Sequence, residues 1–348
     1  MKKKDTHNFS SKLLQWYDLH GRKDLPWQQS INAYRVWVSE IMLQQTQVNT
    51  VTPYYLRFMH RFANVDALAA ASTDEVMHHW SGLGYYSRAR NLHATALRIR
   101  DEFSSQFPND IDLLQSLPGI GRSTAGAICA IAFNSPCAIL DGNVKRVLAR
   151  HNNIDGWPGK SSVAKQLWQI AEQHTPTQRN RDYTQAIMDL GATVCTRSKP
   201  HCNDCPVMNT CTAYAEQTMH ELPGKKPKKV LPEKSAKLLL IENSDGEILL
   251  FKKPPTGVWG GLWSLPDELE IDAAMQLDMH STWPMLRHTF SHYHFDITPV
   301  HCKLSRFTGT MDGANQLWYN ISMPPNIGIA APIKKLLQQY ANEKSTAP

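Results

Sequence analysis

The sequence lacks any long apolar run. No uninterrupted apolar stretch reaches the roughly 18 residues that a membrane-spanning helix requires. A signal peptide is not expected either, because polar residues 5–8 follow the basic start Met1–Lys4 where an apolar segment would be needed. Cysteine is scarce: the seven residues are an odd number, and four of them lie within residues 195–211. This distribution favours a metal site in a reducing compartment over a disulfide framework, so we expect a cytoplasmic protein without a membrane segment.

A strong excess of one charge is also missing. The net charge is +6 and the isoelectric point is near 8.9, which permits binding to nucleic acid but does not establish it. Apolar residues make up 42% of the chain and charged residues 20%, which are ordinary proportions for a globular protein. The length of 348 residues suits about two domains, and no internal repeat is apparent.

Strand-like alternation is absent before Cys195. Apolar residues recur there at helical spacing instead, for example Phe9, Leu13 and Tyr17. We predict helices at 9–20, 34–51, 53–62, 64–71, 73–80, 87–103, 110–116, 122–133, 143–151, 161–173 and 178–194. Residues 1–224 are therefore expected to form an all-helical domain.

The composition changes at residues 225–233, where lysine and proline predominate and predict an exposed linker. Beyond it, Ser244-Asp245-Gly246 separates two apolar segments and is a hairpin signal. The predicted strands and a closing helix lie at 238–242, 247–251, 292–297 and 332–340. We therefore expect an α+β domain over residues 234–348.

Residues 111–130 contain a glycine hairpin that opens a helix, Leu117-Pro-Gly-Ile-Gly121. Gly119 and Gly121 permit backbone angles that other residues avoid, and the turn leaves amides free at a helix N-terminus, where phosphate binds. Downstream, the segment 140–146 places one carboxylate, Asp141, just before a basic helix. Together the two segments suggest a nucleic-acid backbone held beside an acid.

Four cysteines follow the spacing Cys195-x6-Cys202-x2-Cys205-x5-Cys211. Four thiolates within so short a segment suit a tetrahedral site for zinc or a [4Fe–4S] cluster, and the spacing alone does not choose between these. The loop between the first two cysteines is basic, which suits contact with phosphate.

Glu40 lies among apolar residues of a predicted helix, so its carboxylate is either exposed on the polar face or desolvated. The polar run Gln44-Gln-Thr-Gln47 follows directly and carries side chains suited to base edges and to wedging between bases. The residues alone leave both interpretations of Glu40 open.

These segments together resemble a known family. The hairpin Leu117–Gly121, the segment 140–147 and the cysteine spacing are similar to the endonuclease-III-like, iron–sulfur branch of the helix-hairpin-helix DNA glycosylases. Within that branch, Trp37–Gln47, Gly82–Tyr86 and Phe290–His292 resemble the MutY family of adenine DNA glycosylases, and the resemblance spans almost the whole chain. It implies a monomeric base-excision repair enzyme, cytoplasmic and associated with the nucleoid, that acts on double-stranded DNA with 8-oxoguanine:A or G:A mispairs. It also implies a [4Fe–4S] cluster on Cys195, Cys202, Cys205 and Cys211.

The resemblance assigns chemistry to two carboxyl groups. Glu40 would protonate adenine N7 so that the base departs as a neutral molecule, and its apolar neighbours predict a raised pKa. Asp141 would stabilise the oxocarbenium ion that forms on the sugar, and it can also cap the helix that follows. Ser123 occupies the position where lyase relatives carry a lysine, so the enzyme is expected to be monofunctional.

The same motif matches imply further contacts with DNA. The adenine pocket would be lined by Trp27, Lys23, Gln185 and Ser123. The wedge and the 8-oxoguanine contacts would come from Gln45, Thr46, Leu83, Tyr85, Ser291 and His292. Phosphates would bind Gly119, Gly121, Arg146, Arg197 and Lys199.

The C-terminal domain resembles a Nudix fold, because Gly257–Trp263 matches the stretch after the first hairpin of such domains. The paired acidic residues of the metal-binding Nudix helix do not follow, since Asp267–Glu270 leads into the apolar Ala273–Met275. We therefore expect a domain that recognises 8-oxoguanine and has no pyrophosphohydrolase activity.

Two alternatives remain to be weighed. An endonuclease-III-like bifunctional glycosylase/lyase would carry an amine at position 123 and would not need the second domain. A non-catalytic lesion-binding protein would not need both Glu40 and Asp141. Both alternatives therefore match the sequence less well than a monofunctional adenine DNA glycosylase.

Overall fold

The computed structural model describes residues 6–227, 230–311 and 313–346. The basic start Met1–Lys4 and the linker residues Lys228 and Lys229 lie outside the described residues. Within those ranges, no helix combines the length and the apolar character needed to span a membrane.

The chain divides into two compact units. Unit 1 comprises Met1–Ala70 and Asn91–Lys228, and unit 2 comprises Ala71–Arg90 and Lys229–Pro348. Residues 71–90 therefore group with the C-terminal domain, although the sequence places them in the middle of the predicted helical domain. This segment includes the Gly82–Tyr86 motif.

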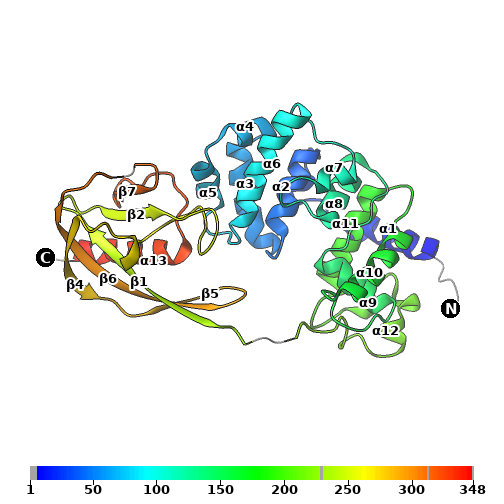
Figure 1. The fold of residues 1–348 in the computed structure, drawn as a ribbon. Coiled ribbons are helices and arrows are strands. Elements are labelled where there is room, and N and C mark those ends of the chain that lie inside the picture. Colours follow the sequence, from blue (N-terminus) through cyan, green and yellow to red (C-terminus); the bar gives the residue numbers. More distant parts are fainter. Residues whose placement is uncertain (1–5, 228–229, 312, 347–348) are drawn as a thin grey trace. The chain divides into compact units, whose positions relative to one another are not determined.

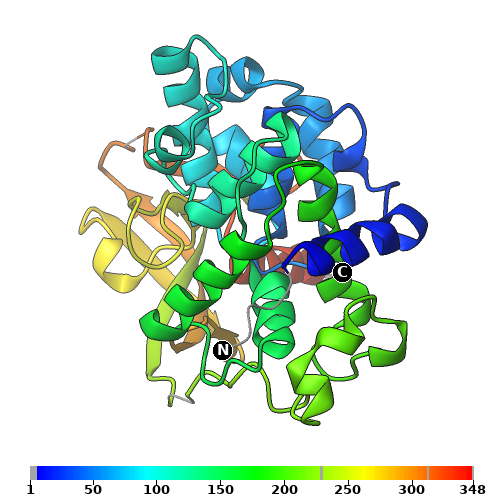
Figure 2. The ribbon, with the colours of Figure 1, turned by 90° about the vertical axis from the view of Figure 1, so that its right-hand side faces the viewer.

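Unit 1 is helical, and its described residues contain no strand, as the sequence predicts. Its main helices are α1 (Thr6–His20), α2 (Ala33–Leu43), α3 (Val48–Arg61), α4 (Val65–Ala70), α6 (Ser87–Phe103, from Asn91 onward), α7 (Ile111–Gln115), α8 (Arg122–Phe133), α9 (Gly142–His151), α10 (Ser161–His174), α11 (Asn180–Asp189) and α12 (Thr212–Ala215). Short turns complete it at η1 (Pro26–Gln28), η2 (Leu190–Val194), η3 (Cys202–Asp204) and η4 (Met208–Thr210). The apolar helix α2, with Trp37 fully buried, packs against α8, and α1 packs against α10 and α11 from far along the chain (Figures 1 and 2).

The predicted helix at 34–51 is wrong in one respect, because the structure interrupts it between α2 and α3. Gln45 adopts the left-handed conformation, with φ of +58°, and the Thr46 amide donates to the Leu43 carbonyl in a turn (3.2 Å). The polar run Gln44–Gln47 therefore forms the connection between two helices. The periodic apolar pattern continues across the turn, which is why it did not reveal the break.

The predicted glycine hairpin connects α7 to α8. Asp110 caps α7 by accepting hydrogen bonds from the Asp112 and Leu113 amides (2.9 Å each). Gly119 has φ of +77°, and a Cβ there would lie 2.8 Å from Asn91 Cβ, so both conformation and space require glycine. The chain that leaves α8 then returns past Gly126 and leads into Asp141 at the start of α9.

Unit 2 contains a mixed seven-stranded sheet, in agreement with the α+β prediction. Its strands are β1 (Glu233–Glu242), β2 (Ile248–Lys252), β3 (Trp263–Ser264), β4 (Met275–Thr282), β5 (Leu286–Thr289), β6 (His294–Phe307) and β7 (Gln316–Tyr319), accompanied by α5 (Thr73–Trp80), η5 (Glu268–Glu270) and α13 (Ala331–Thr346). The order is β3-β2-β1-β6-β4, with β5 paired to β6 and β7 to β2. β1 and β6 run parallel and the remaining pairs antiparallel.

Gly126 allows the segment before Asp141 to approach α8 closely. A Cβ at Gly126 would lie 2.3 Å from the backbone oxygen of Ala138, so we expect Gly126→Ala to lower the free energy of unfolding by about 1–3 kcal/mol. Urea denaturation followed by circular dichroism measures this change. Gly121→Ala is the matched control, because a Cβ there meets nothing within 4 Å and φ is −86°. Equal stabilities of the two variants would contradict the close approach.

Candidate active site

A cavity of about 770 Å³ opens in unit 1. Its walls come from segments that are distant in sequence, including the turn before α2, the α2–α3 connection, parts of α8, α9 and α11, and the segment 192–197 after α11. It brings together nine of the predicted site residues: Trp27, Glu40, Gln45, Thr46, Ser123, Asp141, Arg146, Gln185 and Arg197. Lys23, Gly119, Gly121 and Lys199 are not among the residues that line it.

Glu40 lies in the last turn of α2, next to the buried Ile41, and its half-buried side chain lines the cavity. Burial and, secondly, the negative charge of Asp141 raise the pKa of Glu40 to about 8. At neutral pH the carboxyl is therefore mainly protonated, and it can donate that proton to a bound molecule.

Asp141 is held at the N-terminus of α9. Its carboxylate accepts hydrogen bonds from the Val144 amide (2.8 Å) and from Asn143 Nδ2 (3.2 Å). Burial raises the pKa of Asp141, but these two donors and the charge of Arg146 oppose that rise. Asp141 therefore has hydrogen-bond donors and a nearby positive charge that favour its ionised form, whereas burial and the charge of Asp141 both favour the neutral form of Glu40.

Arg146 connects this carboxylate to the cysteine-rich segment. Its Nη2 donates to Asn143 Oδ1 (2.8 Å) and to the Gly191 carbonyl (2.6 Å), while its Nε donates to the Cys195 carbonyl (2.7 Å). Asn143 in turn donates to Asp141, so a continuous hydrogen-bonded path runs from Cys195 to Asp141. Arg146 was expected to contact phosphate, and no local motif in the sequence indicates the role of Asn143.

Ser123 lies in the first turn of α8 and lines the cavity. Its Oγ accepts a hydrogen bond from the Leu140 amide (3.0 Å), one residue before Asp141. The hydroxyl therefore has a structural role in addition to its position at the cavity: it fixes the backbone that carries the carboxylate.

An aromatic contact and a side-chain hydrogen bond hold the cavity wall around Trp27 in place. Trp27 is 6% exposed and meets the Tyr55 ring edge to face at 5.5 Å. Gln28 Nε2 donates to Gln185 Oε1 (3.3 Å), which joins the turn to α11. Lys23 points elsewhere, since its Nζ donates to the Asp18 carbonyl (2.8 Å).

A second connection to α11 was missed by the sequence analysis. Arg22 donates to Asp189 from its backbone amide (2.8 Å), its Nε (3.0 Å) and its Nη2 (2.6 Å), and Asp189 is 1% exposed. Both residues line the cavity. They lie 167 positions apart, and no local motif indicates their pairing.

Comparisons with known proteins agree with this geometry. Residues 38–173 match the family model described as HhH-GPD superfamily base excision DNA repair protein, and residues 237–339 match a NUDIX domain. An adenine DNA glycosylase of Buchnera aphidicola subsp. Baizongia pistaciae is 38% identical over 94% of this chain and 95% of its own. The chain belongs to the adenine DNA glycosylase family. It is accordingly a DNA N-glycosylase of base excision repair that binds DNA.

Other relatives of the glycosylase support the same conclusion. The human adenine DNA glycosylase is 35% identical over 82% of this chain and 65% of its own. A thermostable thymine-DNA glycosylase is similar in structure, with a TM-score of 0.55 and 26% identity over 61% of this chain and 97% of that one. Endonuclease III in a DNA complex shares the fold of the helical part, with a TM-score of 0.51 and 19% identity over 62% of this chain and 98% of that one.

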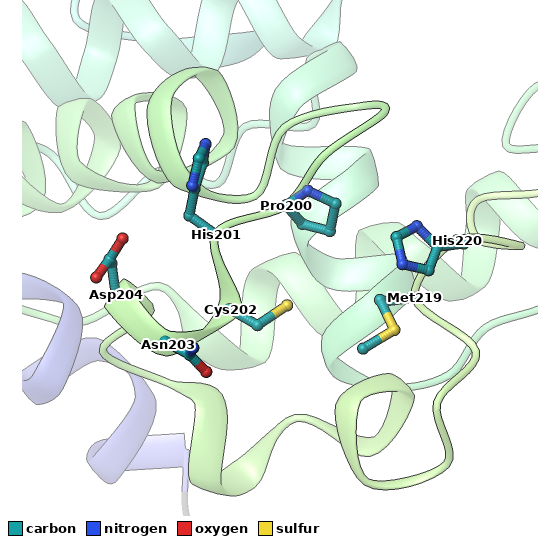
Figure 3. Close-up of a pocket in the computed structure, with 7 residues that line it drawn as sticks. All are labelled: Pro200, His201, Cys202, Asn203, Asp204, Met219 and His220. Atoms are coloured by element: carbon teal, nitrogen blue, oxygen red, sulfur yellow. The ribbon is translucent and has the colours of Figure 1, made fainter.

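The four clustered cysteines of the glycosylase line one cavity in unit 1, together with Arg150, Met208 and other residues. Arg150 is buried and fixes this segment, since its Nη1 donates to Cys195 Sγ (3.4 Å) and to the Thr196 carbonyl (2.7 Å). Cys202 also lines a neighbouring cavity of about 410 Å³, where its sulfur lies on the side facing Met219 (Figure 3). Cys202 is therefore the cysteine shared by the two cavities.

Four predicted contact residues of the glycosylase lie in unit 2. Leu83 is buried and Tyr85 is 47% exposed, both in the connection between α5 and α6. Ser291 and His292 are exposed between β5 and β6, and Ser291 Oγ lies 3.4 Å from His292 Nδ1. Phe290, beside them, contacts Trp259 at 6.3 Å between ring centroids, so an aromatic cluster supports this turn.

The raised pKa of Glu40 predicts a pH-dependent stability for the glycosylase. Between the unfolded value near 4.5 and about 8, the folded state retains a proton that the unfolded state has lost, so the free energy of unfolding falls as pH rises. Glu40→Gln has no titrating side chain at this position, so it removes this loss of stability with rising pH. We expect the variant to be more stable than the wild type by about 1–3 kcal/mol at pH 8, and equally stable at pH 4. Urea denaturation across this range tests it, and parallel pH profiles would contradict the raised pKa.

Proposed function

We propose that this enzyme hydrolyses the N-glycosidic bond of adenine mispaired with 8-oxoguanine, and also with guanine, in double-stranded DNA. The observation that carries the proposal is a single cavity that brings together Glu40, whose pKa is raised to about 8, and Asp141, which accepts a hydrogen bond from the Val144 amide. Adenine as the excised base is supported by the similar proteins, which are adenine DNA glycosylases. We further infer a monomer that acts in the cytoplasm at the nucleoid.

The two carboxyl groups suit the two halves of the reaction. Adenine is a poor leaving group as an anion, so Glu40 transfers its proton to N7 while the electrons of the C1′–N9 bond pass to the base. The sugar then carries oxocarbenium character, which the negative charge of Asp141 stabilises. Water adds to C1′ and loses a proton to a carboxylate of the cavity, which leaves an abasic site and neutral adenine.

Adenine must leave the duplex to reach Glu40, at a cost of a few kcal/mol. The wall that includes Trp27 offers a surface for stacking, and the side-chain amide of Gln185, which accepts a hydrogen bond from Gln28, offers polar atoms for an adenine edge. Gln45 and Thr46 lie at the same cavity, in the turn that projects from α2. We infer that this turn enters the duplex when the base is extruded.

The same cavity supports hydrolysis without strand cleavage. Ser123 provides a hydroxyl that is bonded to the Leu140 amide, and no lysine is among the described residues that line the cavity. Imine formation with the sugar needs an amine at that place. We therefore infer a monofunctional glycosylase.

A [4Fe–4S] cluster on Cys195, Cys202, Cys205 and Cys211 fits the cysteine segment. The four cysteines line the wall of a shared cavity, which brings the four proposed ligands together. Burial raises the pKa of the Cys202, Cys205 and Cys211 thiols, so a positively charged group is needed to keep them ionised. When bound, the cluster would supply that charge and cross-link residues 195–211. Arg197 and Lys199, with the amides at Gly119 and Gly121, are the proposed phosphate contacts.

We expect Glu40→Gln and Asp141→Asn each to lower the single-turnover excision rate on an 8-oxoguanine:A duplex by about 10²–10⁴-fold, because each removes one half of the acid–anion pair. Duplex binding, measured by fluorescence anisotropy, should stay within about threefold of the wild type. The wild-type rate should fall as pH rises through about 8, where Glu40 loses its proton. Glu102→Gln is the control, since Glu102 is exposed in α6 and pairs with Arg98. Near-wild-type rates in either active-site variant would refute the assignment.

We propose that Ser291 and His292 recognise 8-oxoguanine. Because both are exposed, Ser291→Ala and His292→Ala should leave the fold intact and reduce the preference for 8-oxoguanine:A over G:A duplexes by about tenfold in the double variant. Competition between the two duplexes in one excision assay measures the preference. Gln276→Ala, at an exposed position on β4, is the control. An unchanged preference in the double variant would exclude this role.

A further inference from the structure

The segment 71–90 is attached to the C-terminal domain through the first turn of α5. Asp74 Oδ2 pairs with Lys252 Nζ (2.9 Å), and Asp74 Oδ1 accepts a hydrogen bond from Trp263 Nε1 (3.4 Å). Lys252 and Trp263 are paired residues of the neighbouring strands β2 and β3. A single carboxylate therefore joins α5 to two strands of the sheet within unit 2.

Two further contacts hold the same segment. Met77 is fully buried, and a Cβ at Gly328 would lie 2.5 Å from Met77 Cβ, so α5 packs closely on this part of the domain. At the other end of the segment, Arg90 donates from Nη1 to the carbonyl of Gly260. Gly260 lies within the Gly257–Trp263 stretch. Both ends of the 71–90 segment are thus fixed to the C-terminal domain.

The connection between these ends carries Leu83 and Tyr85 and is itself tightly braced. The Gly84 carbonyl accepts from Trp80 Nε1 (3.1 Å) at the end of α5 and from Arg88 Nη2 (3.1 Å) at the start of α6. Tyr85 has φ of +49° and is half exposed, with the Arg88 guanidinium 5.4 Å from its ring centroid. Any displacement of α5 or of Arg90 therefore moves the backbone of this turn.

We propose that the C-terminal domain positions the Gly82–Tyr86 turn through Asp74 and Arg90, and that it supports mispair binding by this route in addition to its own Ser291 and His292. Asp74, Lys252 and Arg90 are positioning residues, because they act through the turn. The link to mispair binding rests on the function proposed above, whereas the effect on the turn does not. Residues 71–90 then belong to the C-terminal recognition domain, although in the sequence they lie between the two parts of the helical domain.

Hydrogen–deuterium exchange of the full-length protein tests the positioning directly. We expect the amides of residues 81–87 to exchange at least about threefold faster in Asp74→Asn, Lys252→Met and Arg90→Met than in the wild type, because the turn loses an anchor. Lys252→Arg retains the charge and should restore slow exchange. Lys237→Met is the matched control, since it breaks the exposed Lys237–Glu268 pair of the same unit away from the turn.

Binding and rate measurements complete the test. The dissociation constant for an 8-oxoguanine:A duplex should rise about threefold in the three anchor variants, while the single-turnover rate at saturating enzyme stays within about twofold. Unchanged exchange at residues 81–87 in all three variants would overturn the proposal, as would an equal increase in β1 and β6. If the wild type fails to excise adenine from this duplex, the proposed function fails, and the exchange measurement still decides whether the domain positions the turn.

Discussion

Desolvation of the Glu40 carboxyl is the constraint on which the proposed catalytic arrangement of this glycosylase depends. The cavity raises the pKa of Glu40 to about 8, while the amide of Val144 and the side chain of Asn143 donate to Asp141 nearby. Burial raises the pKa of both carboxyl groups, but hydrogen-bond donors oppose that rise only at Asp141, which also caps a helix. This difference in surroundings is what supports a different proposed role for each of the two carboxyl groups.

Helix α9 provides the groups that make the surroundings of Asp141 different from those of Glu40. Its N-terminus provides the amide for Asp141, and one turn later Arg146 is bonded to Asn143, Gly191 and Cys195. Protein carbonyls and an amide oxygen accept these hydrogen bonds, and the charge of Arg146 is one of several influences that lower the pKa of Asp141. The cysteine-rich segment consequently supports the carboxylate as well as any contact with phosphate.

Local signals in the sequence predicted much of this site. The glycine hairpin, the cap at Asp141 and the cysteine spacing each depend on residues within a few positions of one another, and the two-domain division into helical and α+β parts follows from periodicity. The turn at Gln45, the Arg22–Asp189 pair and the attachment of Asp74 to Lys252 were not predictable in the same way. The Arg22–Asp189 and Asp74–Lys252 pairs form only when distant segments pack together, and neither composition nor periodicity records such contacts. The turn at Gln45 is local, but the apolar periodicity continues across it.

The hydrogen bond from the Leu140 amide to Ser123 has an evolutionary consequence. A lysine at that position would supply a nucleophile for strand cleavage and would at the same time leave the Leu140 amide without its acceptor, one residue from Asp141. Gain of lyase chemistry would therefore come with weaker control of the carboxylate that is proposed to stabilise the sugar cation. Separate lineages specialised in one chemistry or the other are the expected outcome of such an exchange.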